Sequence, residues 1–371
     1  MAQQANYHQQ AQIKRTQRIR EICKELPDAC SDFFFAVSQT TSALTRLAYA
    51  YDLRLFFQYL TLEQADFSGC DPRLITVDQI GKITARQLRD YQDYLTQYIK
   101  QNDDQTNEVI VSNHELGIMR KMCALRSFFE YLFSEEKIPA NISTLIPLPK
   151  RHEKPILYLE KEEVEKLLDV AENGSGLTEQ QKRFQKVTKN RDIAILTLFL
   201  GTGIRVSELV GIDIDDVDFS INGFVVTRKG GNQTILYFPE TVAENLQTYL
   251  RERREIEAAP GDENALFLSL QKRRITQRAV EKLVKKYAAI AAPLKKKISP
   301  HKLRSTFGTS LYQETGDIYL VADVLGHADV NTTRKHYAAM TDQRKREAAK
   351  RVVLPEIQNM NAPEDKTDES L

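Results

Sequence analysis

Two short segments in the second half of the chain place positively charged side chains where they could hold an anion. In GTGIRVSELVGI, Arg205 follows a Gly-Thr-Gly turn and Glu208 lies one helical turn further on, on the same face. In SPHKLRSTFGTSL, His301 and Arg304 are three residues apart and would also be neighbours on one helical face. Guanidinium groups are permanently charged planar forks that match the oxygens of a phosphate. Phosphate binding is therefore the chemistry that these two segments could support.

Two further segments carry groups that can transfer a proton or attack a substrate. Lys229 lies in the Gly-rich turn RKGGNQ, and LGHADVNTTRKHYAAM contains His327 at a turn and Tyr337 within a helix that Asn331 or Thr332 could cap. Taken singly, each residue has an ordinary structural explanation. An Arg with a Glu three residues on is usually a surface pair, a turn lysine is usually solvated, and a helical tyrosine usually packs in a core.

The order of these motifs is more specific than any one of them. R-x-x-E, a hairpin Lys, H-x-x-R, L-G-H and then a Tyr before a basic helix together resemble the tyrosine-recombinase (phage-integrase) family. The resemblance runs from about residue 159 to 353, and more loosely over residues 33–140, where TRLAYAYDLRLFF looks like the family's DNA-clamping domain. Bacterial Xer-type recombinases and conjugative-transposon or phage integrases look most similar.

The resemblance implies a role for each candidate. The implied catalytic set is Arg205, Lys229, His301, Arg304, His327 and Tyr337. The two arginines would bind the scissile phosphate, and the two histidines would complete the phosphate and proton-transfer shell. Lys229 would be the general acid, Tyr337 the nucleophile and Glu208 a supporting residue. His327 and Tyr337 are ten residues apart, one more than in many relatives, so an over-rigid alignment would select His336. Tyr337 is preferred because the family's nucleophile is a phenol.

The implied reaction cuts and rejoins DNA without a metal or cofactor. Two guanidiniums can neutralise the charge on a pentavalent phosphate transition state. The sequence has no Cys/His ligand set, so no metal site and no cofactor are expected. A tyrosine ester keeps the energy of the broken bond, and a second 5′-hydroxyl can therefore reverse the step without ATP.

The elements that must position these residues fall into two regions. The first looks all-helical, with helices expected in TSALTRLAYAYDLRLFFQYL, ITARQLRDYQDYLTQYIK and LGIMRKMCALRSFFEYLFSEEKI. The segment IPANISTLIPLPKRHEKPI has four prolines and is the expected linker. Beyond it, AENGSGLTEQQKRFQKVTKN (171–190) is interpreted as a polar surface insertion. GFVVT and TILYF flank RKGGNQ as a β-hairpin, and most of the remainder is helical.

The expected fold class is mainly α. It combines, as the resemblance implies, a helical N-terminal core-binding domain of SAM-like type with a mixed, mostly helical catalytic domain that has a small β-hairpin or sheet. The expected boundaries are an N-terminal extension over 1–30, the core-binding domain over 31–148, a linker over 149–158, the catalytic domain over 159–354 and an acidic disordered tail over 355–371.

The net charge of +1 conceals a segregation of charge. From Pro355 onward there are five acids against Lys366, so the rest of the chain carries +1 − (−4) = +5. Between Lys272 and Arg304, 12 Lys/Arg stand against one acid. Such a run is either a solvated face or a surface for phosphates. The candidate DNA-binding residues are Arg120, Arg126, Lys272, Arg273, Arg274, Lys295, Lys296, Lys297 and Lys302.

The expected partner is double-stranded DNA carrying an inverted-repeat recombination site, bound by a homo-tetramer or by a hetero-tetramer with a paralogous recombinase. A type IB topoisomerase would share the tyrosine chemistry, and a DNA-binding protein with a decayed site is the non-enzymatic alternative. No apolar run approaches the roughly 18 residues of a membrane span and the N-terminus has no signal-peptide pattern, so a cytoplasmic location is expected. The four cysteines are widely spaced and are expected to be reduced thiols.

Overall fold

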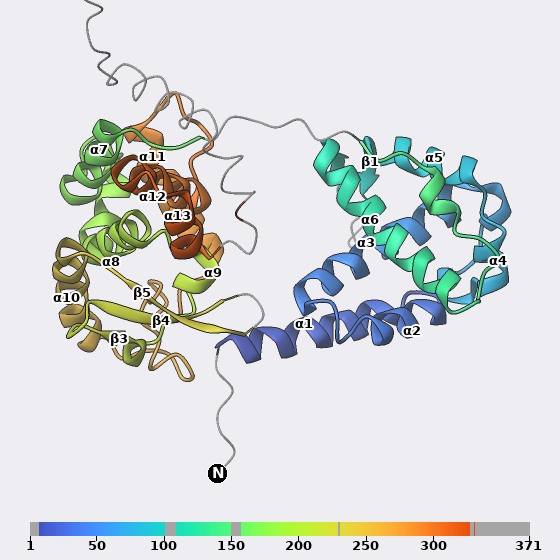
Figure 1. Ribbon diagram of the computed structural model, residues 1–371, viewed down its shortest axis with the longest axis horizontal. Coiled ribbons are helices and arrows are strands. Elements are labelled where there is room, and N and C mark those ends of the chain that lie inside the picture. The colour runs from blue at the N-terminus through green and yellow to red at the C-terminus, as the bar shows by residue number, and fades with distance from the viewer. Residues whose placement is uncertain (1–6, 101–108, 150–156, 229–230, 327–329, 331–371) are drawn as a thin grey trace, which may run out of the picture. The chain divides into compact units, whose positions relative to one another are not determined.

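A computed structural model describes residues 7–100, 109–149, 157–228, 231–326 and 330 of the 371-residue chain. The chain divides into two compact units, and the division between their main parts falls between residues 154 and 155 (Figure 1). Within the described ranges, no helix combines the length and the apolar character that crossing a bilayer requires.

The first unit is built mainly from helices with well-formed N-termini. Its helices are α1 (Tyr7–Cys23), α2 (Asp28–Ala36), α3 (Ala43–Glu63), α4 (Val77–Gly81), α5 (Ala85–Tyr94) and α6 (Glu115–Ser134), with the 3-10 helices η1 (Ala65–Phe67), η2 (Pro72–Leu74) and η3 (Ile142–Leu145). The Ser42 hydroxyl accepts the Thr45 amide at the start of α3, and Thr84 with Gln87 forms a capping box at the start of α5. Such caps satisfy amides that have no partner within the helix.

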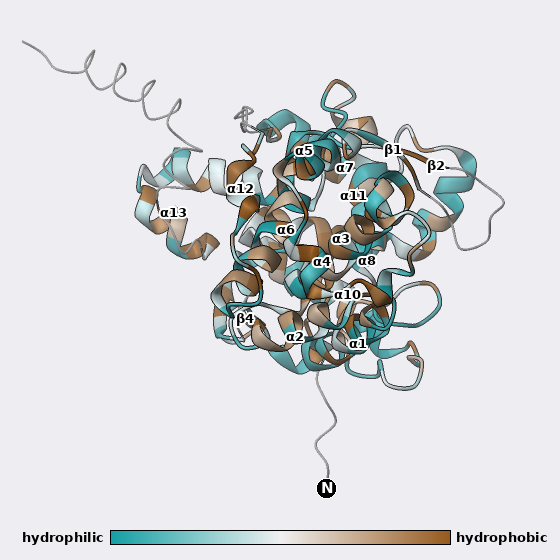
Figure 2. Ribbon diagram, turned by 90° about the vertical axis from the view of Figure 1, so that its right-hand side faces the viewer, coloured by the Kyte–Doolittle hydropathy of each residue, from teal (hydrophilic) through white to brown (hydrophobic). Residues whose placement is uncertain are grey.

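Aromatic side chains from several helices form the core of this unit. Phe57 of α3 and Phe33 of α2 both meet the ring of Phe128 of α6 edge to face, with centroids 6.1 and 5.5 Å apart. In Figure 2 the ribbons of α3 and α6 carry brown, apolar stretches. Helix α1 contributes Ile19 and Ile22 to the same core, so part of the segment interpreted as an N-terminal extension packs with the helices that follow it.

A β-hairpin interrupts the helices of the first unit, and the expectation that this region is all-helical was wrong. Strand β1 (Gln97–Lys100) pairs antiparallel with β2 (Val109–Ser112), and Tyr98 lies opposite Val111. Helix α5 stops at Tyr94 because the next residues bond across the hairpin: the Asn113 amide donates to the Thr96 carbonyl at 3.1 Å. The run YIK together with VIV suits a strand pair better than a continuation of the helix.

The second unit combines helices with one small sheet. Its helices are α7 (Lys161–Asn173), α8 (Glu179–Thr202), α9 (Val206–Leu209), α10 (Glu240–Arg254), α11 (Gln277–Ala291), α12 (Pro300–Thr315) and α13 (Ile318–Leu325), with the 3-10 helix η4 (Ile214–Asp216). Its strands β3 (Val217–Asp218), β4 (Gly223–Thr227) and β5 (Gln233–Tyr237) follow one another in a three-stranded sheet. The sequence prediction of a mainly α fold with a small hairpin and sheet in this region is confirmed.

Residues 171–190 are not a surface insertion, because they contain the end of α7 and the first half of α8. Gly174 ends α7 in the left-handed conformation, with φ of 71°, and Thr178 with Gln181 forms a capping box that starts α8. Gln185 is buried and donates to the carbonyls of Ala171 and Glu172 at the end of α7. The polar residues of this segment therefore bond to unpaired backbone groups at helix ends. Their polarity suggested a loop because those partners cannot be seen in the sequence.

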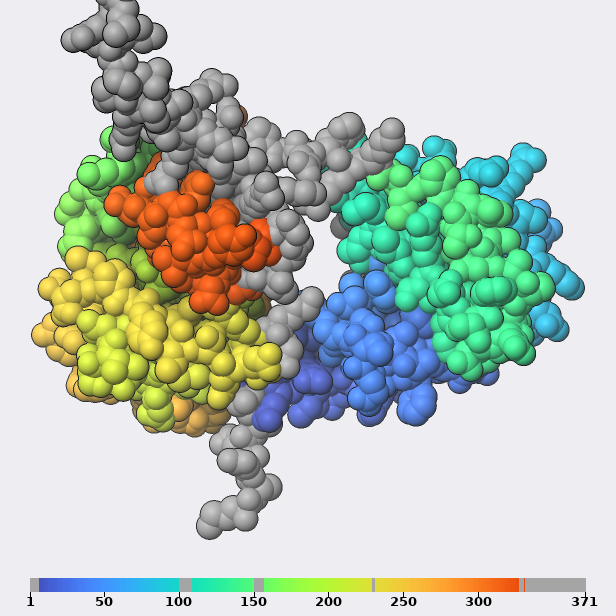
Figure 3. Space-filling model, in the orientation of Figure 1, coloured from blue at the N-terminus to red at the C-terminus, as the bar shows by residue number. Residues whose placement is uncertain are grey.

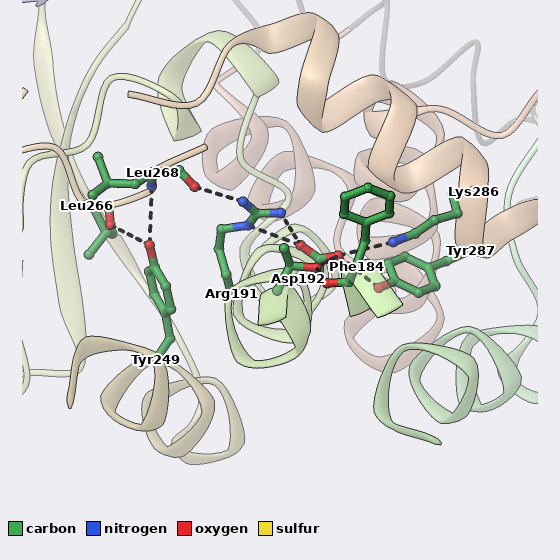
Figure 4. Close-up of polar contacts among 9 residues, drawn as sticks. Phe184, Arg191, Asp192, Tyr249, Leu266, Leu268, Lys286 and Tyr287 are labelled. Carbon is green, nitrogen blue, oxygen red and sulfur yellow. Dashed lines mark hydrogen bonds and ion pairs between the residues drawn. The ribbon is translucent and has the colours of Figure 1, made fainter. Parts of the chain in front are cut away.

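A buried carboxylate joins α8 to α11 (Figure 4). Asp192 is 1% exposed and accepts the Tyr287 hydroxyl at 2.8 Å and the Arg191 guanidinium at 2.7 Å. Thr188 and Lys286 also donate to it, and Arg191 reaches on to the Leu268 carbonyl at 2.8 Å. Burial lowers the pKa of Lys286. This network fixes α8, whose far end carries the candidate site.

Candidate active site

The first candidate arginine is positioned by the turn that ends α8. The helix stops at Gly203, which has a φ of 62°, a left-handed conformation that favours glycine. A Cβ atom at this glycine would lie 2.4 Å from the ring of Phe307 and 2.9 Å from the Leu325 side chain. The Gly-Thr-Gly turn therefore lets the end of α8 approach α12 and α13 closely. Arg205 follows in extended conformation as the N-cap of α9.

Glu208 holds Arg205 through both its backbone and its side chain. One carboxylate oxygen accepts the Arg205 amide at 3.0 Å, and the other accepts the guanidinium at 2.8 Å. Glu208 is 4% exposed, whereas the Arg205 side chain is 34% exposed. A buried carboxylate that makes both bonds keeps the guanidinium in one orientation while leaving it accessible. This arrangement fits the supporting role expected for Glu208.

The second candidate arginine is buried in α12. Arg304 is 6% exposed, and its two terminal nitrogens donate to the carbonyls of Gly203 and Leu325. The Gly203 carbonyl belongs to the turn that positions Arg205. Arg304 therefore joins the end of α8 to the end of α13 within the second unit.

The two guanidiniums converge on the C-terminus of α13. Arg205 donates to the carbonyls of Gly326 at 2.9 Å and Leu325 at 3.3 Å, and Arg304 donates to the same Leu325 oxygen. Residues far apart in the sequence thus share one acceptor. The convergence creates a local concentration of positive charge, which is the electrostatic requirement for holding a phosphate. In Figure 3 the orange atoms of the α12 and α13 region lie at the surface of the second unit.

The other members of the expected catalytic set are described in part or not at all. His301 is the second residue of α12 and is exposed, one helical turn before Arg304. Lys229, His327 and Tyr337 lie outside the described residues. The described chain reaches Arg228, one residue past the end of β4 and directly before Lys229, and it reaches Gly326 directly before His327. The structure therefore brings together three of the seven expected site residues, Arg205, Glu208 and Arg304, and places His301 on the same helix as Arg304.

The basic candidates of the second unit differ in how they are engaged. Lys272, Arg273, Lys296 and Lys297 are exposed, and Lys302 is half-buried. Arg274 is 12% exposed and donates to the carbonyls of Val210 and Ile212, which is a structural role. Lys295 is paired with Glu163 at 2.5 Å and donates to the Tyr158 carbonyl.

The two arginine candidates of the first unit are also engaged in the fold. Arg120 pairs through both terminal nitrogens with Asp52, a carboxylate whose pKa is raised by burial although Arg120 opposes the shift. The Arg120 side chain is still 48% exposed. Arg126 donates to the Ile146 carbonyl. Of the two, Arg120 keeps more surface for a phosphate.

Two features of the site were missed from the sequence. The exposed side chains Arg278, Lys282 and Lys285 follow each other at spacings of four and three along α11 and form a basic stripe. That spacing is visible in the sequence and could have selected these residues from the basic run. The α13 carbonyls that receive both arginines are backbone atoms, and no residue type signals them. In the described ranges, no group of His, Cys, Asp and Glu side chains could hold a metal ion.

Comparison with known proteins identifies the family. The family model described as "Phage integrase family" matches residues 158–344. Over 346 residues the chain is 33% identical to a protein named tyrosine recombinase XerC from Caldanaerobacter subterraneus subsp. tengcongensis, with 91% of this chain and 90% of the relative covered. The chain belongs to the phage integrase family. The resemblance read from the order of the motifs is confirmed.

Solved structures of other tyrosine recombinases share the fold. The XerH site-specific recombinase bound to a palindromic difH substrate is 20% identical, with a TM-score of 0.61, and the match covers 90% of this chain and 94% of that chain. The Tn1549 transposon integrase in complex with circular intermediate DNA is 18% identical, with a TM-score of 0.59 and coverage of 86% and 98%. These likenesses confirm the fold class of this phage integrase family member.

Proposed function

We propose that this member of the phage integrase family is a site-specific DNA recombinase that cleaves a strand through Tyr337 and rejoins it to a partner strand. The observation that carries the proposal is the convergence of Arg205 and Arg304 on the carbonyls of Leu325 and Gly326, the first two residues of the L-G-H motif at the end of α13. Two arginines brought together from separate segments meet the first requirement of metal-independent phosphoryl transfer.

In the proposed reaction the arginines stabilise charge that develops on the phosphate. Each guanidinium can present parallel N–H groups to the non-bridging oxygens of a pentavalent transition state. Glu208 maintains the orientation of Arg205. Loss of one preorganised donor typically costs about 3 to 4 kcal/mol in transition-state stabilisation. A lysine in place of either arginine would lose the planar fork and is not a conservative change.

The bond changes are balanced between a phenol and a 5′-hydroxyl. The Tyr337 oxygen bonds to phosphorus as it loses its proton, and the bond from phosphorus to the 5′-oxygen breaks. Lys229 gives the leaving 5′-oxygen a proton, while His301 and His327 complete the phosphate and proton-transfer shell. The product is a 3′-phosphotyrosyl ester. Attack by the 5′-hydroxyl of a partner strand reverses the chemistry and restores a DNA backbone.

DNA holding is assigned to the basic surface of the second unit, with a contribution from the first. The α11 stripe of Arg278, Lys282 and Lys285, together with exposed Lys296 and Lys297, can contact phosphates, which position DNA without reading its sequence. Arg120 is the first unit's candidate. The proposed assembly is a homo-tetramer, or a hetero-tetramer with a paralogous recombinase, on an inverted-repeat site, acting in the cytoplasm.

A covalent-trapping experiment tests this function. The full-length protein first selects its site from a random-sequence duplex library, and that site is then supplied as a nicked suicide duplex in excess EDTA. A protein–DNA adduct that survives denaturation is expected. Absence of an adduct with a site that the protein binds would favour a DNA-binding protein without cleavage activity. Recovery of the adduct only with added magnesium would contradict the metal-independent mechanism.

A further inference from the structure

The backbone carbonyls at the end of α13 accept hydrogen bonds from both arginines. The Leu325 oxygen accepts from Arg205 at 3.3 Å and also from Arg304, and the Gly326 oxygen accepts from Arg205 at 2.9 Å. These acceptors are the last carbonyls of a helix, which have no amide partner within it and carry the negative end of the helix dipole. Two like-charged guanidiniums are thereby held side by side.

The acceptors point toward the arginines because of one backbone conformation. Gly326 is the C-cap of α13, with φ of 58° and ψ of 52°, and its amide bonds back to the Ala322 and Asp323 carbonyls. This left-handed conformation is easy for glycine, tolerable for asparagine and strained for a β-branched residue. Val321 and Leu325 are buried beneath the turn against Tyr312 of α12. Packing therefore fixes the helix, and the glycine sets where its final carbonyls point.

We propose that the C-terminal turn of α13, Leu325 with the left-handed Gly326, is a positioning device that holds Arg205 and Arg304 in register with each other. The inference rests on the proposed function, because it assigns these two residues to the same phosphate-binding site. Glu208 constrains only Arg205, and the Gly203 carbonyl constrains only Arg304. Among the contacts described for these arginines, the α13 turn alone constrains both.

Variants at Gly326 and a matched glycine test the proposal. Gly326→Val distorts the turn, whereas Gly326→Asn can keep it. The matched control is Gly316→Val, because Gly316 is the left-handed C-cap of α12, with φ of 71°, in the same unit. Both valine variants carry the same kind of backbone strain, so a general loss of stability affects both. Melting curves are recorded for all three, and Gly326→Ala replaces Gly326→Val if the latter does not fold.

The first readout needs no DNA. In ¹⁵N-arginine NMR spectra, guanidinium protons bonded to carbonyls exchange slowly, and the signals are assigned by their loss in Arg205→Lys and Arg304→Lys. The Nη2 atom of each arginine bonds the α13 carbonyls, whereas Nη1 bonds Glu208 or the Gly203 carbonyl. Gly326→Val is therefore expected to remove the slow Nη2 signals of both arginines together, while Gly326→Asn and Gly316→Val retain them. Retention of either arginine's Nη2 signals in folded Gly326→Val would overturn the proposal, whatever the protein does to DNA.

The second readout is the single-turnover rate of adduct formation on the selected suicide duplex. Gly326→Val is expected to react on the order of 100-fold more slowly than wild type at saturating DNA, as for loss of a preorganised donor. The DNA affinity of Gly326→Val should stay within about threefold of wild type. The rates of adduct formation by Gly326→Asn and Gly316→Val should also stay within about threefold of wild type. Equal slowing of Gly326→Val and Gly316→Val would overturn the positioning role. A wild-type protein that forms no adduct would instead contradict the proposed function and leave the NMR result to decide the geometry.

Discussion

At the scale of single residues, the proposed site separates the groups assigned to hold the phosphate from the groups assigned to react with it. Arg205 and Arg304 are fixed by a buried carboxylate and by helix-end carbonyls. The groups assigned to bond making and proton transfer, Tyr337 and Lys229, come from segments outside the described residues. Holding and reacting can therefore be tested separately by substitution.

Tyr337→Phe should abolish the covalent adduct while leaving DNA affinity unchanged. The substitution removes only the phenolic oxygen, and the arginines and basic surface proposed to bind phosphates are unaltered. The measurement combines adduct formation on the suicide duplex with a binding titration at fixed salt. His336→Phe is the neighbouring control and should still form the adduct. An adduct in Tyr337→Phe would show that another residue is the nucleophile.

Lys229→Ala should be rescued by a substrate that needs no general acid. If Lys229 protonates the leaving 5′-oxygen, replacing that bridging oxygen by sulfur removes the need, because a thiolate leaves without a proton. The measurement is the ratio of cleavage rates on the two substrates. Wild type should show a small ratio and Lys229→Ala a much larger one. Equal ratios would transfer the general-acid role to the histidines.

The sequence predicted which candidate residues would be neighbours, but not how deeply each would be buried. The spacing R-x-x-E placed Arg205 and Glu208 on one helical turn, and the structure has them in contact. H-x-x-R placed His301 and Arg304 on one face of a helix, but the first is exposed and the second buried. What decides that difference is the packing of α12 against α8 and α13, a long-range property that local spacing does not contain.

At the scale of elements, the Asp192 network should make α8 and α11 depend on one carboxylate. Asp192→Asn leaves Arg191 and Lys286 without their anion in a region where these side chains are 15% and 22% exposed. The free energy of unfolding should fall by about 3 kcal/mol. Tyr287→Phe, which removes one hydrogen bond, should cost about 1 kcal/mol. Urea unfolding measures both.

The matched control for this prediction is Glu165→Gln, on the exposed face of α7, which should change stability by no more than about 0.5 kcal/mol. An Asp192→Asn protein as stable as this control would mean that the network contributes no net stability.

Elements were predicted well where apolar periodicity was strong and poorly where polar residues had partners. The helix at α3 and the hairpin of β4 and β5 follow their sequence patterns. The first half of α8 was missed because Gln185 and Thr188 are buried by hydrogen bonds rather than by apolar contacts. The β1 strand was missed because its partner follows only after an intervening segment, so the pairing has no local signal.

At the scale of the whole molecule, the segment after Tyr337 should control assembly. Truncation after Thr341 removes a segment with a basic helical pattern. Its apolar stripe, made of Ala348, Ala349, Val352 and Val353, is small for a helix that packs against its own unit. We expect a folded protein that binds a half-site but loses cooperative pairing and strand exchange. Sedimentation on full-site DNA beside a melting curve measures this.

Two results would contradict this expectation in different ways. A folded truncation that still assembles and recombines normally would show that the segment has no part in pairing. A truncation that does not fold would indicate that the segment packs within its own unit. The matched control is truncation after Leu354, which removes only the acidic segment from Pro355 onward. It should leave both stability and pairing unchanged.

The close approach at Gly203 has an evolutionary consequence. A side chain there meets two separate obstacles: the left-handed backbone, and the Phe307 ring with the Leu325 side chain. Starting from a Gly203→Ala gene, selection for activity should recover smaller residues at position 307, because these relieve the steric overlap. They leave the backbone strain at position 203 in place, so such revertants regain only part of the lost stability. The effects of Gly203→Ala and of the substitution at position 307 on stability are therefore not additive. Full recovery of stability requires a return to glycine at position 203, so selection should retain glycine there.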